Sequence, residues 1–346
     1  MITIRKRAVI CCAALVLASP PAIAKYSDAF FFGNSVSDTG NVAYVVDHTL
    51  GFFASDPLRT SVPIPSPDFV ATYPYANNRY SNGPVWAEYF ATGLGETAAP
   101  ALRGGTNYAF GGATMGPLGN VVPPSIRDQI SSYLVTHGNR ASPNALYVIE
   151  GGGNDARRAA DVWISLGDPA PIVSGYVRDA LASILALESA GAHNILFWNV
   201  PDIGKTPEFL FQGPAAAAKA TGIASAMNAA LAAALDALGP NLKRDLRTFD
   251  IFGFMNQVIA NPSAFGLVDV SSACAFSTAC IADPSRALFW DGLHPTTAGH
   301  ALVANAALAS VNPEPEMYVL FGIGLVALAC HRTFRDRRTR RVSAMT

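Results

Sequence analysis

The chain has 346 residues, of which 50% are hydrophobic and 14% are charged, so it can bury a sizeable core in one large domain or two small ones. When the basic residues near its two ends are set aside, residues 25–331 contain 15 Lys and Arg against 24 Asp and Glu, a net charge of −9. An acidic body without a run of basic residues argues against nucleic acid as a partner.

The first 24 residues are predicted to be a removable export signal. Three basic residues at positions 5–7 precede an apolar run from Ala8 to Ala18, and Ala22-Ile23-Ala24 has the small-residue pattern that signal peptidase cleaves. A retained membrane helix is the weaker alternative, because the run is too short to span about 30 Å of hydrocarbon. We therefore expect the mature chain to start at Lys25.

The stretch from Phe30 to Asn41 (FFFGNSVSDTGN) contains the candidate nucleophile. An apolar run over 29–32, predicted to be a buried strand, ends at Gly33 and is followed by Asn34 and Ser35. In open α/β sheets ligands bind at the carboxyl ends of the strands, and a glycine there allows a sharp turn. Ser35 is thus the candidate, although a glycine turn followed by a helix cap would give the same pattern without any chemistry.

The segments that follow alternate between helix and strand. The stretch 47–80, rich in Pro, Ser, Tyr and Asn, is predicted to be a long loop. We expect strands over 107–110, 145–149 and 194–198 and helices over 84–91, 126–134, 172–190 and 213–238, after which 247–252 continues the alternation. This order predicts a mostly parallel sheet with helices on both faces and requires no second domain.

Three of these strands end in polar or glycine-rich turns that contain Ser35, Gly111-Gly112 and Asn154. Parallel strands present their carboxyl ends at one edge of the sheet, so the three turns can meet there. In the segment FWDGLHPT, Asp291 precedes His294 by three residues. Its carboxylate could hold one ring nitrogen of His294 while the other takes the proton of Ser35, as in a catalytic triad.

Acyl transfer also needs hydrogen-bond donors for the oxyanion, and three are predicted. They are the backbone N–H groups of Ser35 and Gly112 and the side-chain amide of Asn154. Each piece has an ordinary structural alternative: a glycine turn, a helix cap at Asn154, or a surface histidine at His294. The segments that contain the candidate Ser, Gly, Asn and His occur in this order, each at a strand end or turn. Their joint occurrence favours a catalytic site.

Two cysteines, Cys274 and Cys280, lie in the body of the chain, in the small-residue segment SSACAFSTAC. In an exported protein a disulfide between them is favoured over two free thiols. No histidine pair with ligand spacing accompanies them, so no metal site is predicted. The predicted chemistry needs no organic cofactor either.

The last 35 residues form a tripartite tail. Pro313-Glu314-Pro315 precedes an apolar run over 317–330 and then six arginines, and the run is shorter than the roughly 20 residues of a relaxed spanning helix. This tail resembles the PEP-CTERM sorting signal of Gram-negative bacteria. The resemblance implies transient membrane contact through 317–330, cleavage by an exosortase-like enzyme, and release to the periplasm, outer surface or matrix. A plain C-terminal membrane anchor is the alternative.

Taken together, the blocks resemble the GDSL esterases and lipases of the SGNH hydrolase superfamily. FFGNSVSDTGN, NYAFGGA, GGGND and DGLHPT resemble the blocks that supply Ser, Gly, Asn and His, and the match spans residues 28–305. The resemblance implies a flavodoxin-like α/β/α three-layer sandwich. It also implies Ser35, Asp291 and His294 as the catalytic residues, and Gly112 and Asn154 as oxyanion donors beside Ser35.

Two positions depart from the family pattern, because Asn34 stands where the family usually has Asp before the nucleophile and Val36 stands in place of Leu. The sequence nevertheless predicts an export signal over 1–24, a hydrolase domain over 25–311 and a sorting tail over 312–346. The predicted function is an exported serine esterase or lipase acting on lipid acyl esters or polysaccharide acetyl esters. A non-catalytic surface or matrix protein that keeps the fold is the alternative.

Overall fold

A computed structural model describes residues 26–50, 78–118, 123–165 and 167–311. The predicted export signal over 1–24, the tail over 312–346 and residues 51–77 of the predicted loop lie outside the described residues. Residues 26–311 make up one compact unit. All statements below concern this unit.

The central sheet has four parallel strands in the order β1-β2-β3-β4. They are β1 (Ala29–Phe32), β2 (Leu146–Ile149), β3 (Ile195–Trp198) and β4 (Leu246–Phe249). Every residue of the first three strands is buried, as expected for parallel strands covered on both faces. Phe32 pairs with Ile149, and Ile149 with Phe197, so these strands end at the same edge of the sheet.

The predicted strand over 107–110 is wrong as a regular strand. Only a single bridge joins Asn107 to Phe31, although Tyr108 N–H donates to the Phe31 carbonyl at 2.8 Å and Phe110 N–H to the Gly33 carbonyl at 3.1 Å. The side chain of Asn107 accepts the N–H of Ala109 at 2.9 Å, which diverts the backbone from regular pairing. The segment still follows β1 to its end and delivers the next turn to the same edge of the sheet.

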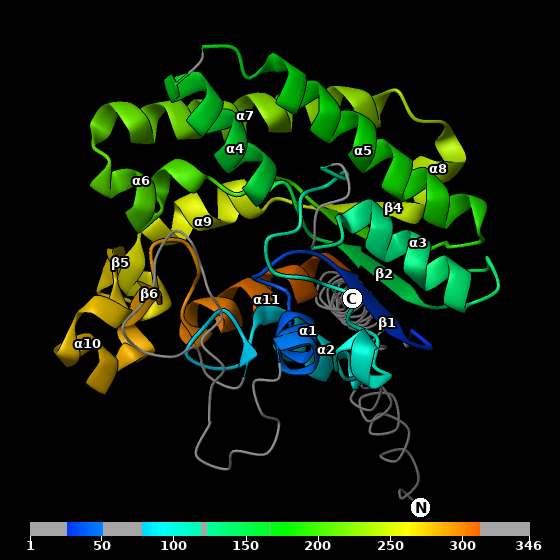
Figure 1. Cartoon of the computed structure of the whole chain (residues 1–346), viewed down its shortest axis with the longest axis horizontal. Coiled ribbons are helices and arrows are strands. Elements are labelled where there is room, and N and C mark those ends of the chain that lie inside the picture. Colours follow the sequence, from blue (N-terminus) through cyan, green and yellow to red (C-terminus); the bar gives the residue numbers. More distant parts are fainter. Residues whose placement is uncertain (1–25, 51–77, 119–122, 166, 312–346) are drawn as a thin grey trace, which may run out of the picture. The chain divides into compact units, whose positions relative to one another are not determined.

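Helices cover both faces of the sheet, as Figure 1 shows. One layer contains α3 (Ile126–Thr136), α4 (Gly153–Ser165), α5 (Ala170–Ser189) and α7 (Pro214–Asp236), which pack against one another. The other contains α1 (Asn41–Leu50), α2 (Trp86–Leu94) and α11 (Thr297–Val311), with α2 packed on α11. This is the predicted three-layer α/β/α sandwich. With the 107–110 segment outside β1, the chain follows the flavodoxin-like order.

Shorter elements complete the domain. The helices are α6 (Pro207–Phe211), α8 (Pro240–Asp245), α9 (Ile251–Ala260) and α10 (Thr278–Ala282), and the strands β5 (Asp269–Ala273) and β6 (Ala287–Phe289) form a small parallel sheet. Single 3₁₀ turns lie at Ala101–Arg103, Ile203–Lys205, Pro262–Phe265, Cys274–Phe276 and Pro284–Arg286.

Two helices bear on the sequence predictions. The strand that the alternation of helices and strands predicts over 247–252 ends at Phe249. The side chain of Asp250 accepts the N–H of Gly253 and caps α9, which starts at Ile251. Helix α5 is long and apolar enough to cross a membrane by length and composition, but it buries one face against α3, α4 and α7. We therefore assign it to the helical layer of the sandwich.

Alternate side chains of β1 anchor the strand on both layers. Phe32 packs edge-on against Tyr133 of α3, whereas Phe31 contacts Trp86 and Phe90 of α2 on the opposite face. Each fully buried aromatic of this size contributes about 1.5–3 kcal/mol to the free energy of folding. The strand that leads to Ser35 is thus fixed from both sides.

Candidate active site

Ser35, His294 and Asp291 form one chain of hydrogen bonds. The Ser35 Oγ lies 2.7 Å from the His294 Nε2, and the His294 Nδ1 lies 2.7 Å from the Asp291 Oδ2. All three side chains are buried, with exposed fractions of 6%, 4% and 1% respectively. Because a carboxylate can only accept, the ring proton belongs on Nδ1, and Nε2 is then free to accept the serine proton.

The turn around Asp291 explains the three-residue spacing. The second oxygen of Asp291, Oδ1, accepts the backbone N–H groups of Leu293 at 2.7 Å and of His294 at 2.6 Å. The backbone closes over the same turn, since Trp290 N–H donates to the His294 carbonyl at 2.8 Å. The Asp291 carboxylate therefore stabilises the turn with one oxygen and orients the His294 imidazole with the other.

The His294 imidazole also packs against the ring of Tyr80. The rings of Tyr80 and His294 lie 5.2 Å apart between centroids, tilted by 34°. Next to Tyr80, the Ser81 hydroxyl donates to the Pro295 carbonyl at 2.9 Å. The segment before α2 thus limits the positions that the His294 ring can occupy.

The turn that carries Ser35 is held by two hydrogen bonds from one polar side chain, that of Gln129. Gln129 of α3 accepts the Gly33 N–H and donates to the Gly33 carbonyl, both at 2.9 Å. A Cβ atom at position 33 would lie 2.8 Å from both the Glu150 Oε2 and the Ser37 Oγ. Gly33 is required here by this close approach, because these side chains occupy the space where its own would stand.

The predicted oxyanion donors come from neighbouring turns. Ser35 and Asn154 line the same cleft, whereas Gly112 is not among its lining residues. Gly112 has a φ of 82°, in a turn that Ala113 N–H closes onto Phe110, and the side-chain amide of Asn154 donates to the Ala113 carbonyl at 2.8 Å. Within the described residues, the backbone N–H groups of Ser35 and Gly112 have no hydrogen-bond partner.

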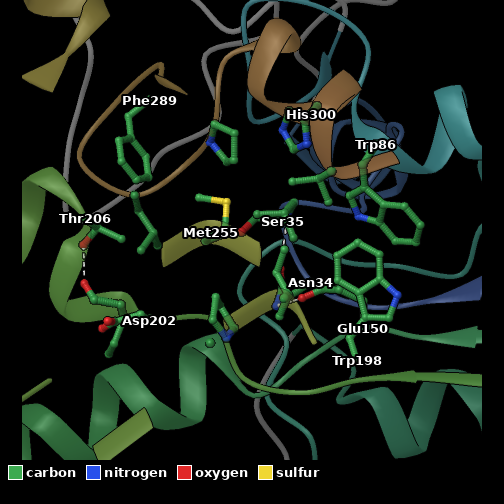
Figure 2. A pocket seen from close by; sticks show the side chains of 18 of the residues that line it. Asn34, Ser35, Trp86, Glu150, Trp198, Asp202, Thr206, Met255, Phe289 and His300 are labelled. Atoms are coloured by element: carbon green, nitrogen blue, oxygen red, sulfur yellow. Dashed lines mark hydrogen bonds between the residues drawn. The ribbon is translucent and has the colours of Figure 1, made fainter. Parts of the chain in front are cut away.

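The cleft beside Ser35 is mainly apolar. Figure 2 shows Trp86 and Trp198 on one side of Ser35, with Met255 and Phe289 toward the other. These residues come from α2, β3, α9 and β6, and further apolar side chains from α9 and α11 extend the wall. His300 of α11 also lines the cleft, but burial lowers its pKa to about 3, so that it stays neutral.

Three carboxyl groups around the site are buried, and burial raises the pKa of each. The pKa of Glu150 rises to about 7, and those of Asp38 and Asp155 rise to about 6. Asp38 caps α1 and accepts the Gly111 N–H at 3.0 Å, and Asp155 accepts the Met115 N–H at 3.0 Å. Sequence reasoning missed Glu150, although an acidic residue directly after a buried central strand was a usable signal.

Cys274, in the 3₁₀ turn after β5, forms the predicted disulfide with Cys280 of α10. In the part of the chain that the structure describes, no group of three or more His, Cys, Asp or Glu side chains could hold a metal ion.

Residues 30–307 match the family model described as GDSL-like Lipase/Acylhydrolase. A protein of Pseudomonas putida, described as uncharacterized and encoded between trpE and trpG, is 27% identical over 95% of this chain and 55% of its own length. Lipase 1 of Photorhabdus luminescens is 30% identical over 54% of this chain and 24% of its own length. The chain therefore spans only about a quarter to a little over half of these two relatives. Among solved structures, the acetylxylan esterase Axe2 of Geobacillus stearothermophilus aligns with a TM-score of 0.41 and 14% identity, covering 83% of this chain and 94% of its own.

Proposed function

Because the chain belongs to the GDSL-like lipase/acylhydrolase family, we propose that it hydrolyses carboxylic esters through a serine acyl-enzyme. The observation that carries the proposal is the unbroken hydrogen-bond chain from Asp291 through His294 to the Ser35 hydroxyl. A serine hydroxyl is a weak nucleophile without a base in reach, and here the base is at 2.7 Å and itself held by a carboxylate.

In the proposed reaction, the Ser35 Oγ forms a bond to the acyl carbon while its proton passes to the His294 Nε2. The Asp291 carboxylate stabilises the imidazolium that results. The imidazolium then gives its proton to the alcohol oxygen as the ester C–O bond breaks, which leaves the acyl group on Ser35. A water molecule repeats the sequence, with His294 as base, and releases the acid.

The oxyanion of each tetrahedral intermediate needs donors that are in place before the reaction. We assign this role to the backbone N–H groups of Ser35 and Gly112 and to one side-chain N–H of Asn154. Asn154 uses the other N–H to bond the Ala113 carbonyl, which fixes the orientation of its amide. Removal of one such donor typically costs about 10²- to 10³-fold in kcat.

The apolar cleft favours lipid acyl chains over polysaccharide acetyl groups as the substrate class. The side chains of Trp86, Trp198, Met255 and Phe289 would bury methylene groups, whereas a mainly apolar lining offers few partners to the hydroxyl groups of a sugar. Each methylene buried contributes about 0.8 kcal/mol, or about fourfold in kcat/KM, until the cleft is filled. An acetyl group, with its single methyl, would leave most of this apolar surface unused.

The test is a series of p-nitrophenyl esters from acetate to palmitate, turned over by the full chain and by Ser35→Ala. We expect turnover that requires Ser35 and a kcat/KM that rises from acetate toward longer acyl chains. A maximum at acetate would contradict the lipid assignment and favour acetyl esters. No Ser35-dependent turnover at any chain length would contradict the esterase proposal and favour a non-catalytic protein with this fold.

We also propose that the protein is exported and processed at both ends. The basic and apolar pattern of residues 1–24 and the Pro313-Glu314-Pro315 tail support this, and the Cys274–Cys280 disulfide suits an oxidising compartment. Mass measurement of the secreted protein should give a chain that starts at Lys25 and ends near Pro313. A product that keeps residues 317–346 would indicate a permanent anchor instead.

A further inference from the structure

A buried carboxylate holds the turn that carries Ser35. Glu150 directly follows β2, is 4% exposed, and accepts three hydrogen bonds from this turn. Its Oε1 accepts the Asn34 side-chain amide at 3.0 Å, and its Oε2 accepts the Asn34 backbone N–H at 3.2 Å and the Ser37 hydroxyl at 2.8 Å. Figure 2 shows Asn34 between Ser35 and Glu150.

The donors around Glu150 are oriented by further bonds. The Asn34 Oδ1 accepts the Val36 N–H at 3.0 Å, so its amide nitrogen must face Glu150. The Trp86 indole N–H donates to the Ser37 Oγ at 3.0 Å, which directs the hydroxyl proton of Ser37 to Glu150. Every polar group facing Glu150 from this turn therefore donates, which suits a carboxylate and not a neutral acid.

Glu150 is not a member of an ordinary buried ion pair. No Lys or Arg in the described part of the chain pairs with it. Carboxylates this deeply buried are usually neutralised by a cation, because desolvation is costly. The positive form of the His294 imidazole attracts the Glu150 carboxylate and lowers its pKa, against the larger effect of burial.

We propose that Glu150 is a positioning residue for the nucleophile. Its carboxylate holds the Asn34 peptide and side chain so that Ser35 faces His294, and its charge favours the imidazolium that forms when Ser35 is deprotonated. This inference rests on the proposed esterase function and extends it with a second carboxylate, one that acts through the turn that carries the nucleophile.

The same arrangement accounts for Asn34. The position needs an acceptor for the Val36 N–H and a donor for Glu150, and the Asn side chain has one of each. An Asp there would place two carboxylates about 3.0 Å apart. The amide and the carboxylate can instead be exchanged. In the double variant Asn34→Asp/Glu150→Gln, the carboxylate introduced at position 34 would accept from both Val36 and the new amide at position 150, and one negative charge is kept.

The test compares four full-length proteins on the best p-nitrophenyl ester: wild type, Glu150→Gln, the double exchange, and Asp179→Asn. Glu150→Gln keeps the shape but removes the charge, and we expect kcat to fall about 10- to 100-fold with little change in KM. The double exchange should recover most of that loss. Asp179 is a buried carboxylate of α5 that pairs with Arg127 and does not line the cleft, so Asp179→Asn should retain wild-type kcat.

A pH profile separates positioning from general loss of structure. In the wild type, kcat should fall as Glu150 is protonated near pH 7, because the neutral acid no longer accepts every donor of the turn, and Glu150→Gln should lack this component of the profile. Tyr176 of α5 also interacts with Glu150, but burial keeps its pKa far above the range studied.

The outcomes are distinguishable. An active wild type with an equally active Glu150→Gln would overturn this inference alone, as would a double exchange no better than Glu150→Gln when both unfold at wild-type temperatures. If Glu150→Gln does not fold, the double exchange decides: a folded but inactive protein would overturn the inference. A wild type without Ser35-dependent turnover would overturn the proposed function, and this inference with it.

Discussion

The buried Glu150 should make the stability of this domain depend on pH, and the size of the effect can be estimated. Burial raises the pKa of Glu150 from 4.5 to about 7. The folded state thus holds this proton more tightly than the unfolded chain does. The contribution of Glu150 to the free energy of unfolding is therefore largest below pH 4.5, falls as the pH rises, and levels off above pH 7.

Between pH 5 and pH 8, these two pKa values correspond to a loss of about 2–3 kcal/mol from Glu150 alone. Asp38 and Asp155 also have raised pKa values and add losses of the same sign. Glu150→Gln removes only the first contribution. The difference in stability between variant and wild type should therefore shift by about 2–3 kcal/mol in favour of the variant over this pH range.

Urea unfolding at pH 5 and pH 8, followed by tryptophan fluorescence with the disulfide intact, measures this difference. Altered hydrogen bonds in Glu150→Gln change its free energy of unfolding by the same amount at both pH values. This amount cancels, because only the change in unfolding free energy between pH 5 and pH 8 is compared. Ser35→Ala leaves Glu150 and its donors in place, so it should follow the wild-type pH dependence. Parallel curves for Glu150→Gln and wild type would refute the reasoning, since Glu150 would then titrate alike in the folded and unfolded chains.

Three further predictions concern the site. Asn154→Ala should lower kcat about 10²- to 10³-fold with little change in KM, because an oxyanion donor is lost; an unchanged kcat would remove Asn154 from the oxyanion hole. Met255→Trp should fill the cleft and move the kcat/KM maximum of the ester series to shorter acyl chains, and an unmoved maximum would place the acyl group elsewhere. Gly33→Ala should destabilise the domain by about 1–3 kcal/mol in urea unfolding, since the added methyl group would lie 2.8 Å from the Glu150 Oε2, and an equally stable variant would show that Glu150 can move aside.

The central parallel strands could be predicted from the positions at which apolar runs end in the sequence. The runs before Gly33, Glu150 and Asn199 are continuous, as in parallel strands covered on both sides, and each ends in a polar or glycine turn. Parallel strands bring such turns to one edge, which is why Ser35 and Asn154 could be expected from the sequence to line one cleft.

Other features depended on geometry that local patterns do not encode. The segment at Asn107 has strand-like residues, but its own side chain competes for a backbone N–H, and Asp250 ends β4 by capping a helix. The cleft walls come from elements spread along the chain, each an ordinary apolar position in its own helix or strand. The role of Glu150 required knowing that the ends of β1 and β2 are neighbours.

The bond between Ser35 and His294 joins residues 259 positions apart. During synthesis the serine emerges first and remains without its base until nearly the whole domain is present. Under the proposed export, a chain carried unfolded through a secretion channel would therefore lack the pair formed by Ser35 and His294 while it crosses the membrane of its own cell. The proposed esterase activity would begin only after export, when the segment that contains His294 docks.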